Sequence, residues 1–326
     1  NGCHKDYKER KIVSFSGLAA RMADQAVFRE ILETVSRAWV DDETEFWFSS
    51  DLAERIRKDF PGIVTHPLVD LNKRIFDAQL PENTALLVCL GGDGTLLDTL
   101  RLVKDSGIAV MGIHFGRLGF LNAVSANNIT QTLRPGFFDE FRRENRLVLE
   151  ACDFEINGVE TRHTSETFPY ALNEIALLKS DTESLVFLDV YVDGAYMNTY
   201  YGDGVIFSTP TGSTAYSLSC GGPILIPSAD NILVTPVASH TLTVRPLILE
   251  GYQEITVEAR GQEQCKLALD SQTYEIKGPF RFKVRKSSFK FITIYPNDRT
   301  FFDGIRDKLM WGLDIRPRPE AIPDKI

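Results

Sequence analysis

A glycine-rich turn between an apolar segment and a helical pattern is the feature that most constrains the fold of this chain. Residues 85–90 (ALLVCL) are continuously apolar, which is typical of a strand buried on both faces of a sheet. Gly91-Gly92-Asp93-Gly94-Thr95 follows directly, and residues 96–103 then show helical spacing. A second apolar strand is expected at residues 108–113. This order predicts parallel strands joined by a right-handed crossover, so we expect a doubly wound, Rossmann-like α/β domain.

The rest of the chain divides into two patterns. Before the turn, strands are expected at residues 11–16 and 45–48 and helices at 20–38 and 51–58. Beyond about residue 125, short alternating segments indicate a largely antiparallel, β-sandwich-like domain; they lie at residues 147–156, 185–192, 204–208, 241–244, 254–259 and 280–284. A helical pattern begins at residue 298, and we expect this last helix to dock on the first domain. The predicted domains are therefore 1–125 together with 298–326, and 126–297.

Charge and hydropathy exclude some classes of protein. The chain of 326 residues has 36 Lys and Arg against 45 Asp and Glu, a net charge of -9, which argues against a general nucleic-acid binder. Residues 204–229 carry no charge, yet this run is crowded with Ser, Thr, Gly and Pro, so it does not predict a membrane span. The five cysteines form no C-x-x-C pair, which favours a reducing, cytoplasmic compartment.

The composition of the glycine turn indicates phosphoryl chemistry. Its three glycines let the backbone approach a ligand closely, and the N–H groups that begin the next helix suit phosphate. Asp93 would repel a phosphate unless it acts through Mg²⁺ or faces a hydroxyl. The simpler alternative is a strand-to-helix turn with Asp93 as the helix cap. The sequence contains no G-x-x-x-x-G-K-[ST] motif, no G-x-G-x-x-G after the first strand and no H-E-x-x-H, which argues against a P-loop kinase and an ordinary dehydrogenase.

Two polar clusters lie in the β-rich part. Asn173 and Glu174 are flanked by apolar residues, and a ribose or an adenine edge would satisfy such a buried pair. Residues 209–219 contain six Ser or Thr hydroxyls, which fit a pocket for a sugar and a base. A structural hydrogen-bond network is the alternative for the first cluster, and a turn-rich loop is the alternative for the second.

Taken together, these motifs resemble the NAD kinase family in order and spacing. The resemblance runs from about residue 85 to the C-terminus and is carried by GGDGT at 91–95, GIHFGRLGFL at 112–121, LNE at 172–174, DG at 203–204, TPTGSTAYSLSCGGPI at 209–224, DSQ at 270–272 and FFDGIRDKLMWG at 301–312. It implies a kinase that transfers the terminal phosphoryl group of ATP, with Mg²⁺, to the 2′-hydroxyl of the adenosine ribose of NAD. A homodimer or homotetramer, in which a neighbouring subunit helps to close the NAD site, is also implied.

The resemblance also implies roles for individual residues. Asp93 is the expected general base, and the expected phosphate-binding residues of the ATP site are Gly91, Gly92, Gly94 and Thr95. The expected NAD-binding residues are Gly94, Phe120, Asn173, Glu174, Tyr201, Asp203, Thr214, Ala215, Tyr216, Ser219, Ala238 and Gln272. No metal ligand is expected from the protein, because Mg²⁺ would arrive with ATP.

Two other functions share some of these features. A lipid kinase of the diacylglycerol type has a similar GGDGT turn, but the chain shows no basic amphipathic helix that would face a membrane. A non-catalytic NADP or nucleotide sensor would have no need of Asp93. The choice between ATP and polyphosphate, and between NAD and NADH, is open at this point.

Overall fold

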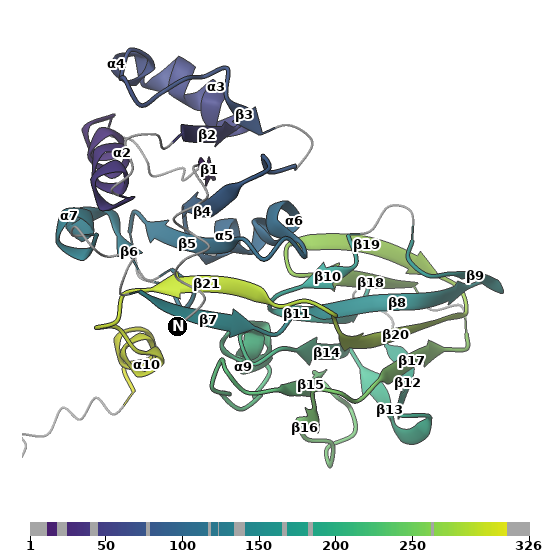
Figure 1. Cartoon of the computed structure of the whole chain (residues 1–326). Helices are drawn as coiled ribbons and strands as arrows, with labels where there is room; N and C mark the ends of the chain where they lie inside the picture. Colours follow the sequence, from purple (N-terminus) through teal and green to yellow (C-terminus); the bar gives the residue numbers. More distant parts are fainter. Residues whose placement is uncertain are drawn as a thin grey trace, which may run out of the picture.

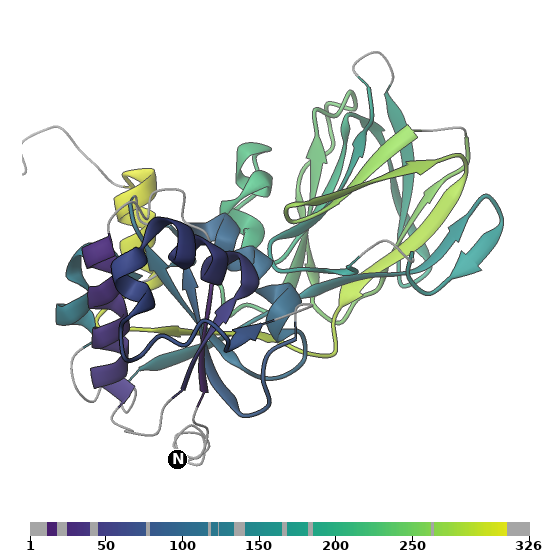
Figure 2. The same cartoon turned by 90° about the horizontal axis from the view of Figure 1, so that it is seen from above.

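The computed structural model describes residues 12–17, 25–39, 45–75, 79–116, 119–122, 124–133, 141–164, 168–181, 185–261 and 264–311. These residues form an α/β part and a β-rich part that lie side by side (Figures 1 and 2). The predicted fold class, an α/β domain followed by a β-sandwich, is confirmed.

The α/β part is built on one mostly parallel sheet. Its central strands run in the order β3-β2-β1-β4-β5-β21-β7, with β6 beside β5, and among them only β7 is antiparallel to its neighbour. The chain changes direction across the sheet between β1 and β4, and ligands of open α/β sheets bind at such a point, beyond the carboxyl ends of the strands. The strands are β1 (Ile12–Ser16), β2 (Glu45–Ser49), β3 (Arg74–Ile75), β4 (Thr84–Leu90), β5 (Ala109–His114), β6 (Val124–Ser125), β7 (Arg142–Arg146) and β21 (Phe291–Tyr295).

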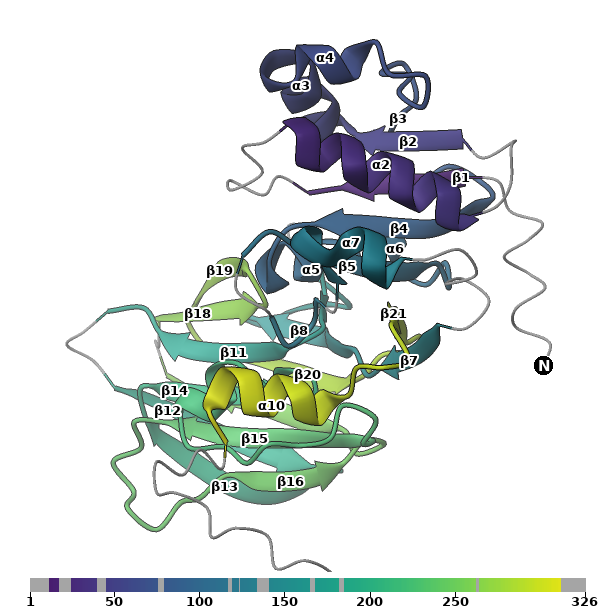
Figure 3. The ribbon, with the colours of Figure 1, turned by 90° about the vertical axis from the view of Figure 1, so that its left-hand side faces the viewer.

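Helices cover both faces of this sheet. Because side chains alternate along a strand, Leu86 and Val88 of β4 pack in one core with α2, whereas Leu87 and Cys89 pack in another with α5 and α6. Figures 1 and 3 show α2 and α7 together on one face. The predicted helix at 96–103 begins earlier, at Asp93, and is divided at Thr99. The helices are α2 (Gln25–Trp39), α3 (Ser50–Asp59), α4 (Pro61–Val64), α5 (Asp93–Asp98), α6 (Leu100–Val103) and α7 (Ile129–Thr132), preceded by the 3-10 turn η1 (Ala126–Asn128).

The β-rich part is a sandwich of two antiparallel sheets. Phe154 and Phe282 from one sheet and Phe207 from the other are fully buried in the shared core. One sheet contains β8 (Leu149–Ile156), β9 (Val159–Thr161), β10 (Tyr170–Ala171), β12 (Val186–Val192), β13 (Ala195–Gly202), β17 (Ile255–Ala259) and β20 (Phe280–Lys286). The other contains β11 (Glu174–Lys179), β14 (Gly204–Ser208), β15 (Asn231–Val237), β16 (Leu247–Glu250), β18 (Gln264–Leu269) and β19 (Gln272–Lys277), and two short turns, η2 (Gly212–Thr214) and α9 (Tyr216–Ser219), follow β14.

Some predicted elements differ from the structure. Residues 241–244 are not a strand; they contain a turn in which the Val244 N–H donates to the Thr241 carbonyl at 3.1 Å. The predicted second domain, 126–297, contains β7 and β21, yet both strands pair within the first sheet because β21 runs parallel to β5 and β7 closes the edge. The predicted division of the chain into two separate ligand-binding domains stays a prediction.

The end of the chain returns to the first domain, as predicted. Helix α10 (Phe301–Leu309) begins with a capping box between Thr300 and Asp303, and its Phe301 ring lies 6.5 Å from the ring of Phe120. The remainder of the predicted segment, residues 312–326, lies outside the described residues. Among the helices that the structure describes, none has the length and apolar character needed to cross a membrane.

Candidate active site

Asp93 is the first residue of α5, and its carboxylate is bound by backbone amides of a distant turn. Its Oδ2 accepts from the Phe120 N–H (2.7 Å), and its Oδ1 accepts from the N–H groups of Leu121 and Asn122 (both 3.3 Å) and from the Asn122 side-chain amide (2.9 Å). The Asp93 side chain retains 27% exposure. Sequence reasoning left helix capping open as an alternative, but the carboxylate is held across the site rather than by its own helix.

Gly119 makes this arrangement possible. A Cβ atom at position 119 would lie 1.6 Å from Asp93 Oδ1. Gly92 and Gly94, in contrast, have no atom within 4 Å of such a position, so the outer side of the turn is open to a ligand. Gly119 therefore has a physical function that its motif alone did not reveal, which is to let the carboxylate approach the backbone.

The second cluster is the turn at residues 172–174, which is held by a half-buried carboxylate. Asp270 accepts from the N–H groups of Leu172 (2.7 Å), Asn173 (2.8 Å) and Glu174 (3.1 Å). Burial raises the pKa of Asp270 to about 6, against the lowering effect of these three hydrogen bonds. The sequence analysis assigned only Gln272 of the DSQ motif to the site, although Asp270 is the residue that shapes this turn.

Glu174 is a half-buried acid with an unsatisfied oxygen. Its carboxyl accepts a backbone hydrogen bond from Tyr216, while Oε2 is buried without a partner among the described residues. Burial, reinforced by the charge of Asp270, raises the pKa of Glu174 to about 8. At neutral pH the group is therefore largely protonated and can donate a hydrogen bond.

The uncharged run divides into structural and accessible hydroxyls. Thr209 donates to the Leu172 carbonyl (2.6 Å), Ser213 donates to the Pro210 carbonyl (2.7 Å), and Ser217 is bonded to Thr235 (2.8 Å). These buried hydroxyls form an internal hydrogen-bond network. It reaches the cluster of Asn173 and Glu174 through the bond from Thr209 to the Leu172 carbonyl. The accessible members are those predicted to contact NAD; Thr214 and Ala215 are half-buried, and Tyr216 and Ser219 are exposed.

Three predicted residues gather around the start of β14. Tyr201 stacks on Phe187 with 4.3 Å between ring centroids, Asp203 pairs with Lys179 (2.8 Å), and Ala238 follows β15 with a φ of 44°. They gather at the Gly204 end of β14, whereas Glu174 pairs with Ser208 at its other end. The separation along β14 is about 13 Å at ~3.3 Å per residue.

A direct hydrogen bond joins the two main clusters. Ser271, in the turn that follows Asp270, donates to Asp98 Oδ1 at 2.8 Å. Asp98 ends the helix that begins with Asp93. The glycine turn and the 172–174 turn are thereby tied to one junction between the α/β sheet and the β-sandwich.

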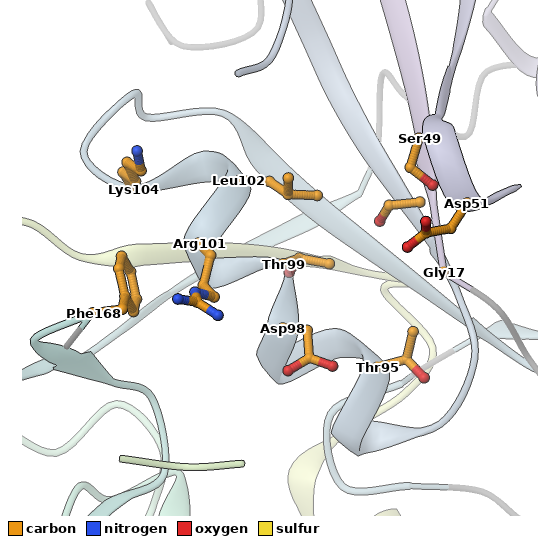
Figure 4. A pocket seen from close by; sticks show the side chains of 11 residues that line it. Gly17, Ser49, Asp51, Thr95, Asp98, Thr99, Arg101, Leu102, Lys104 and Phe168 are labelled. Atoms are coloured by element: carbon orange, nitrogen blue, oxygen red, sulfur yellow. The ribbon is translucent and has the colours of Figure 1, made fainter. Parts of the chain in front are cut away.

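A pocket of about 560 Å³ opens beside the glycine turn, at the carboxyl ends of β1 and β2 (Figure 4). Thr95 and Asp98 face it from α5, and Arg101 reaches it from α6, with its guanidinium 5.3 Å from the ring centroid of Phe168. This size is in the range of small-molecule sites. The complete lining is Ser16, Gly17, Ser49, Asp51, Thr95, Asp98, Thr99, Arg101, Leu102, Lys104 and Phe168.

The fold and the carboxylate-bearing glycine turn at the domain junction define a two-domain kinase. Residues 20–141 match the ATP-NAD kinase N-terminal domain, and residues 172–295 match the ATP-NAD kinase C-terminal domain. The NAD kinase of Flavobacterium johnsoniae is 33% identical over 298 residues, covering 89% of this chain and 99% of the relative. That of Bacteroides fragilis is 39% identical over 243 residues, covering 74% and 79%. The chain belongs to the NAD kinase family.

Solved structures agree with this family membership. The crystal structure of yeast NADH kinase complexed with NADH superposes with a TM-score of 0.79 at 25% identity, covering 94% of this chain and 89% of that one. An NAD kinase from Archaeoglobus fulgidus in complex with ATP shares the fold, with a TM-score of 0.66 at 21% identity over 91% and 98% of the two chains. The predicted function, ATP-dependent phosphorylation of NAD to NADP, is confirmed, and the lipid-kinase and sensor alternatives are not.

Proposed function

We propose that this chain transfers the terminal phosphoryl group of ATP to the 2′-hydroxyl of the adenosine ribose of NAD, with Asp93 as the general base. The observation that carries the proposal is the hydrogen bond between Ser271 and Asp98. It ties the helix that begins with Asp93 to the turn that follows Asp270, whose carboxylate binds residues 172–174, and this supports placing a base and a ribose-binding acid at one junction.

In the reaction, the 2′-oxygen bonds to the terminal phosphorus as the bond from that phosphorus to the bridging oxygen of ADP breaks. The hydroxyl proton passes to Asp93. A carboxylate is a far weaker base than a sugar alkoxide, so Asp93 does not remove the hydroxyl proton before the attack begins. In a loose transition state the proton leaves late, and Asp93 first orients the hydroxyl. The amides of residues 120–122 support this role because they fix the carboxylate before the substrate arrives.

For the acceptor site, we assign the accessible side of the β-rich cluster to the adenosine half of NAD. Protonated Glu174 can donate to a ribose oxygen, which would satisfy its buried Oε2. Gly94 leaves room for close approach, since nothing lies within 4 Å of its missing Cβ. The remaining proposed contacts are Phe120, Asn173, Thr214, Ala215, Tyr216, Ser219 and Gln272.

For the donor, we assign the 560 Å³ pocket to ATP. Gly91, Gly92, Gly94 and Thr95 would bind its phosphates, and Thr95 also lines the pocket itself. Arg101 supplies a positive charge on the side of the pocket away from β1 and β2, where its planar guanidinium lies over the Phe168 ring. If so, Arg101→Ala raises the KM for ATP and leaves the Kd for NAD unchanged; an equal rise in both values would argue against the assignment.

We also propose that Mg²⁺ enters with ATP. Asp51 and Asp98 line the donor pocket, and carboxylate oxygens are ligands that Mg²⁺ accepts alongside phosphate. Within the described ranges, no group of three or more His, Cys, Asp or Glu residues is placed to bind a metal on its own. When bound, the ion would neutralise the charge of the triphosphate. Activity should then follow the concentration of the Mg²⁺–ATP complex rather than that of free Mg²⁺.

A second copy of the chain would complete the NAD site. Tyr201, Asp203 and Ala238 gather about 13 Å along β14 from the Glu174 end at ~3.3 Å per residue, and Phe187, which stacks on Tyr201, is 52% exposed. We therefore propose a cytoplasmic homodimer or homotetramer in which this group serves a neighbouring subunit. Mixing inactive Asp93→Asn and Asp203→Asn chains should restore part of the activity; no recovery after subunit exchange would contradict the shared site.

The reaction itself is tested by initial rates with ATP or polyphosphate crossed with NAD or NADH. NADP or NADPH is read by a coupled dehydrogenase. We expect ATP with NAD to give NADP. Absence of product from this pair, with a folded protein and Mg²⁺ present, would refute the proposed function.

A further inference from the structure

Helix α10 brings a lysine to the carboxylate of Asp93. The Lys308 ammonium lies 3.5 Å from Asp93 Oδ2 and 4.6 Å from the ring centroid of Phe120. The Lys308 side chain is 29% exposed, so it retains access to solvent and to a ligand. The two residues are 215 positions apart, and only the return of the last helix to the first domain places them together.

The position of Lys308 is fixed by packing of α10 on the 119–122 turn. The Phe301 ring contacts Phe120, and a Cβ at Gly304 would lie 3.5 Å from the Phe120 ring, which is ordinary contact. The Phe120 N–H donates to Asp93 Oδ2 at 2.7 Å. One aromatic residue therefore orients both the carboxylate, through its backbone, and the ammonium, through its ring.

Lys308 is not required to satisfy Asp93. The carboxylate already accepts from three backbone N–H groups and from the Asn122 amide. Other cations near α10 are paired elsewhere, Arg299 with Asp307 (3.3 Å) and Arg306 with Asp303. The Lys308 charge is therefore available at the point where a phosphoryl group would meet the hydroxyl held by Asp93.

The sequence also lacks the lysine of a P-loop, which is the usual cation on a transferring phosphoryl group. We propose that Lys308 is a catalytic residue that contacts an oxygen of the transferring phosphoryl group. This inference rests on the proposed function. As the 2′-oxygen bonds to phosphorus and the bond to ADP breaks, the ammonium neutralises charge on the phosphoryl oxygens, while Asp93 takes the hydroxyl proton.

The test compares Lys308→Ala with Arg306→Ala, a cation on the same helix that pairs within α10. For Lys308→Ala we expect kcat to fall by about 100-fold to 1,000-fold, the usual effect of losing one transition-state donor. The Kd for NAD, from calorimetry, and the Tm should change little. Lys308→Arg, or ethylamine added to Lys308→Ala, should restore part of kcat. Arg306→Ala should have near-normal kcat.

Lys308→Met retains the aliphatic contact with Phe120 and replaces the alanine variant if that variant does not fold. A normal kcat in either variant would overturn the inference. A lower kcat together with a lower Tm, restored neither by Lys308→Arg nor by ethylamine, would also overturn it. In that case Lys308 would serve only to hold α10 against the first domain. The wild-type protein in the same assay tests the proposed function separately: if it makes NADP and Lys308→Ala does so equally well, only the inference about Lys308 fails.

Discussion

Ser271 and Asp98 connect the two halves of the candidate active site through a single hydrogen bond of 2.8 Å. Asp98 lies at the end of α5, which begins with Asp93, and Ser271 follows Asp270, which binds the backbone of residues 172–174. The distance between the proposed base and the proposed ribose site therefore depends on contacts at the domain junction as well as on either domain alone.

The coupling between these two residues can be measured. We expect Asp98→Ala and Ser271→Ala to lower kcat/KM for NAD non-additively, with an interaction free energy of about 0.5–1.5 kcal/mol, since each variant removes the same hydrogen bond. The double mutant should be little worse than Asp98→Ala alone, because Asp98→Ala also removes a carboxylate that lines the donor pocket. Strictly additive effects in this cycle would show that the bond does not position the site.

Replacing the proposed base should affect catalysis more than binding. In Asp93→Asn, kcat should fall by roughly 100-fold to 10,000-fold because no group accepts the hydroxyl proton. Calorimetry should still detect NAD, since Asn173, Glu174 and the other contacts of the acceptor site are unchanged. Near-normal turnover of this variant would remove Asp93 from the role of base.

Gly119→Ala should disturb the same carboxylate without altering its chemistry. The new methyl group would occupy a position 1.6 Å from Asp93 Oδ1, so Asp93 or the turn must shift. We expect kcat to fall by about 100-fold, the effect of a misplacement of about 1 Å. Gly304→Ala is the matched control, because its added Cβ meets only ordinary contacts of 3.5 Å and longer. Equal kcat values for the two variants would contradict the clamp on Asp93.

The raised pKa of Glu174 predicts a pH-dependent loss of stability in the unliganded protein. This group has a pKa of about 8 in the folded chain against a model-compound value of 4.5. The unfolded chain releases this proton first as the pH rises, so the stabilising contribution is full below about pH 4.5 and is lost towards about pH 8. Glu174→Gln should therefore be more stable than wild type at pH 9, by about 1–3 kcal/mol, and similar at pH 5.

Denaturant unfolding at the two pH values checks this expectation. Glu275→Gln is a suitable control, because that side chain is 60% exposed and pairs only at the surface with Lys277. In the same Glu174→Gln protein, NAD affinity should be weaker; unchanged affinity in calorimetry would count against Glu174 as a ligand of the ribose.

Local patterns in the sequence determined most of the elements and the chemistry of single residues. The apolar run of β4 and the helical spacing of α2 each depend on neighbouring residues, so local patterns were sufficient to predict them. The strand at residues 241–244 was wrong because alternating polarity over four residues is also compatible with a turn. Asp93, Asn173 and Glu174 were predicted from residue type and motif order.

The tertiary structure alone decided which distant residues meet. Gly119 and Lys308 both contact Asp93, and Asp270 binds residues 172–174. These contacts span 26 to 215 positions, so no local pattern predicts them. The contact of Lys308 also depends on how β21 and α10 return to the first sheet. The pKa of Glu174 is likewise a consequence of burial by packed neighbours, which no motif encodes. The sequence by itself indicated the candidate reacting groups, and long-range packing specified their environment and their distances.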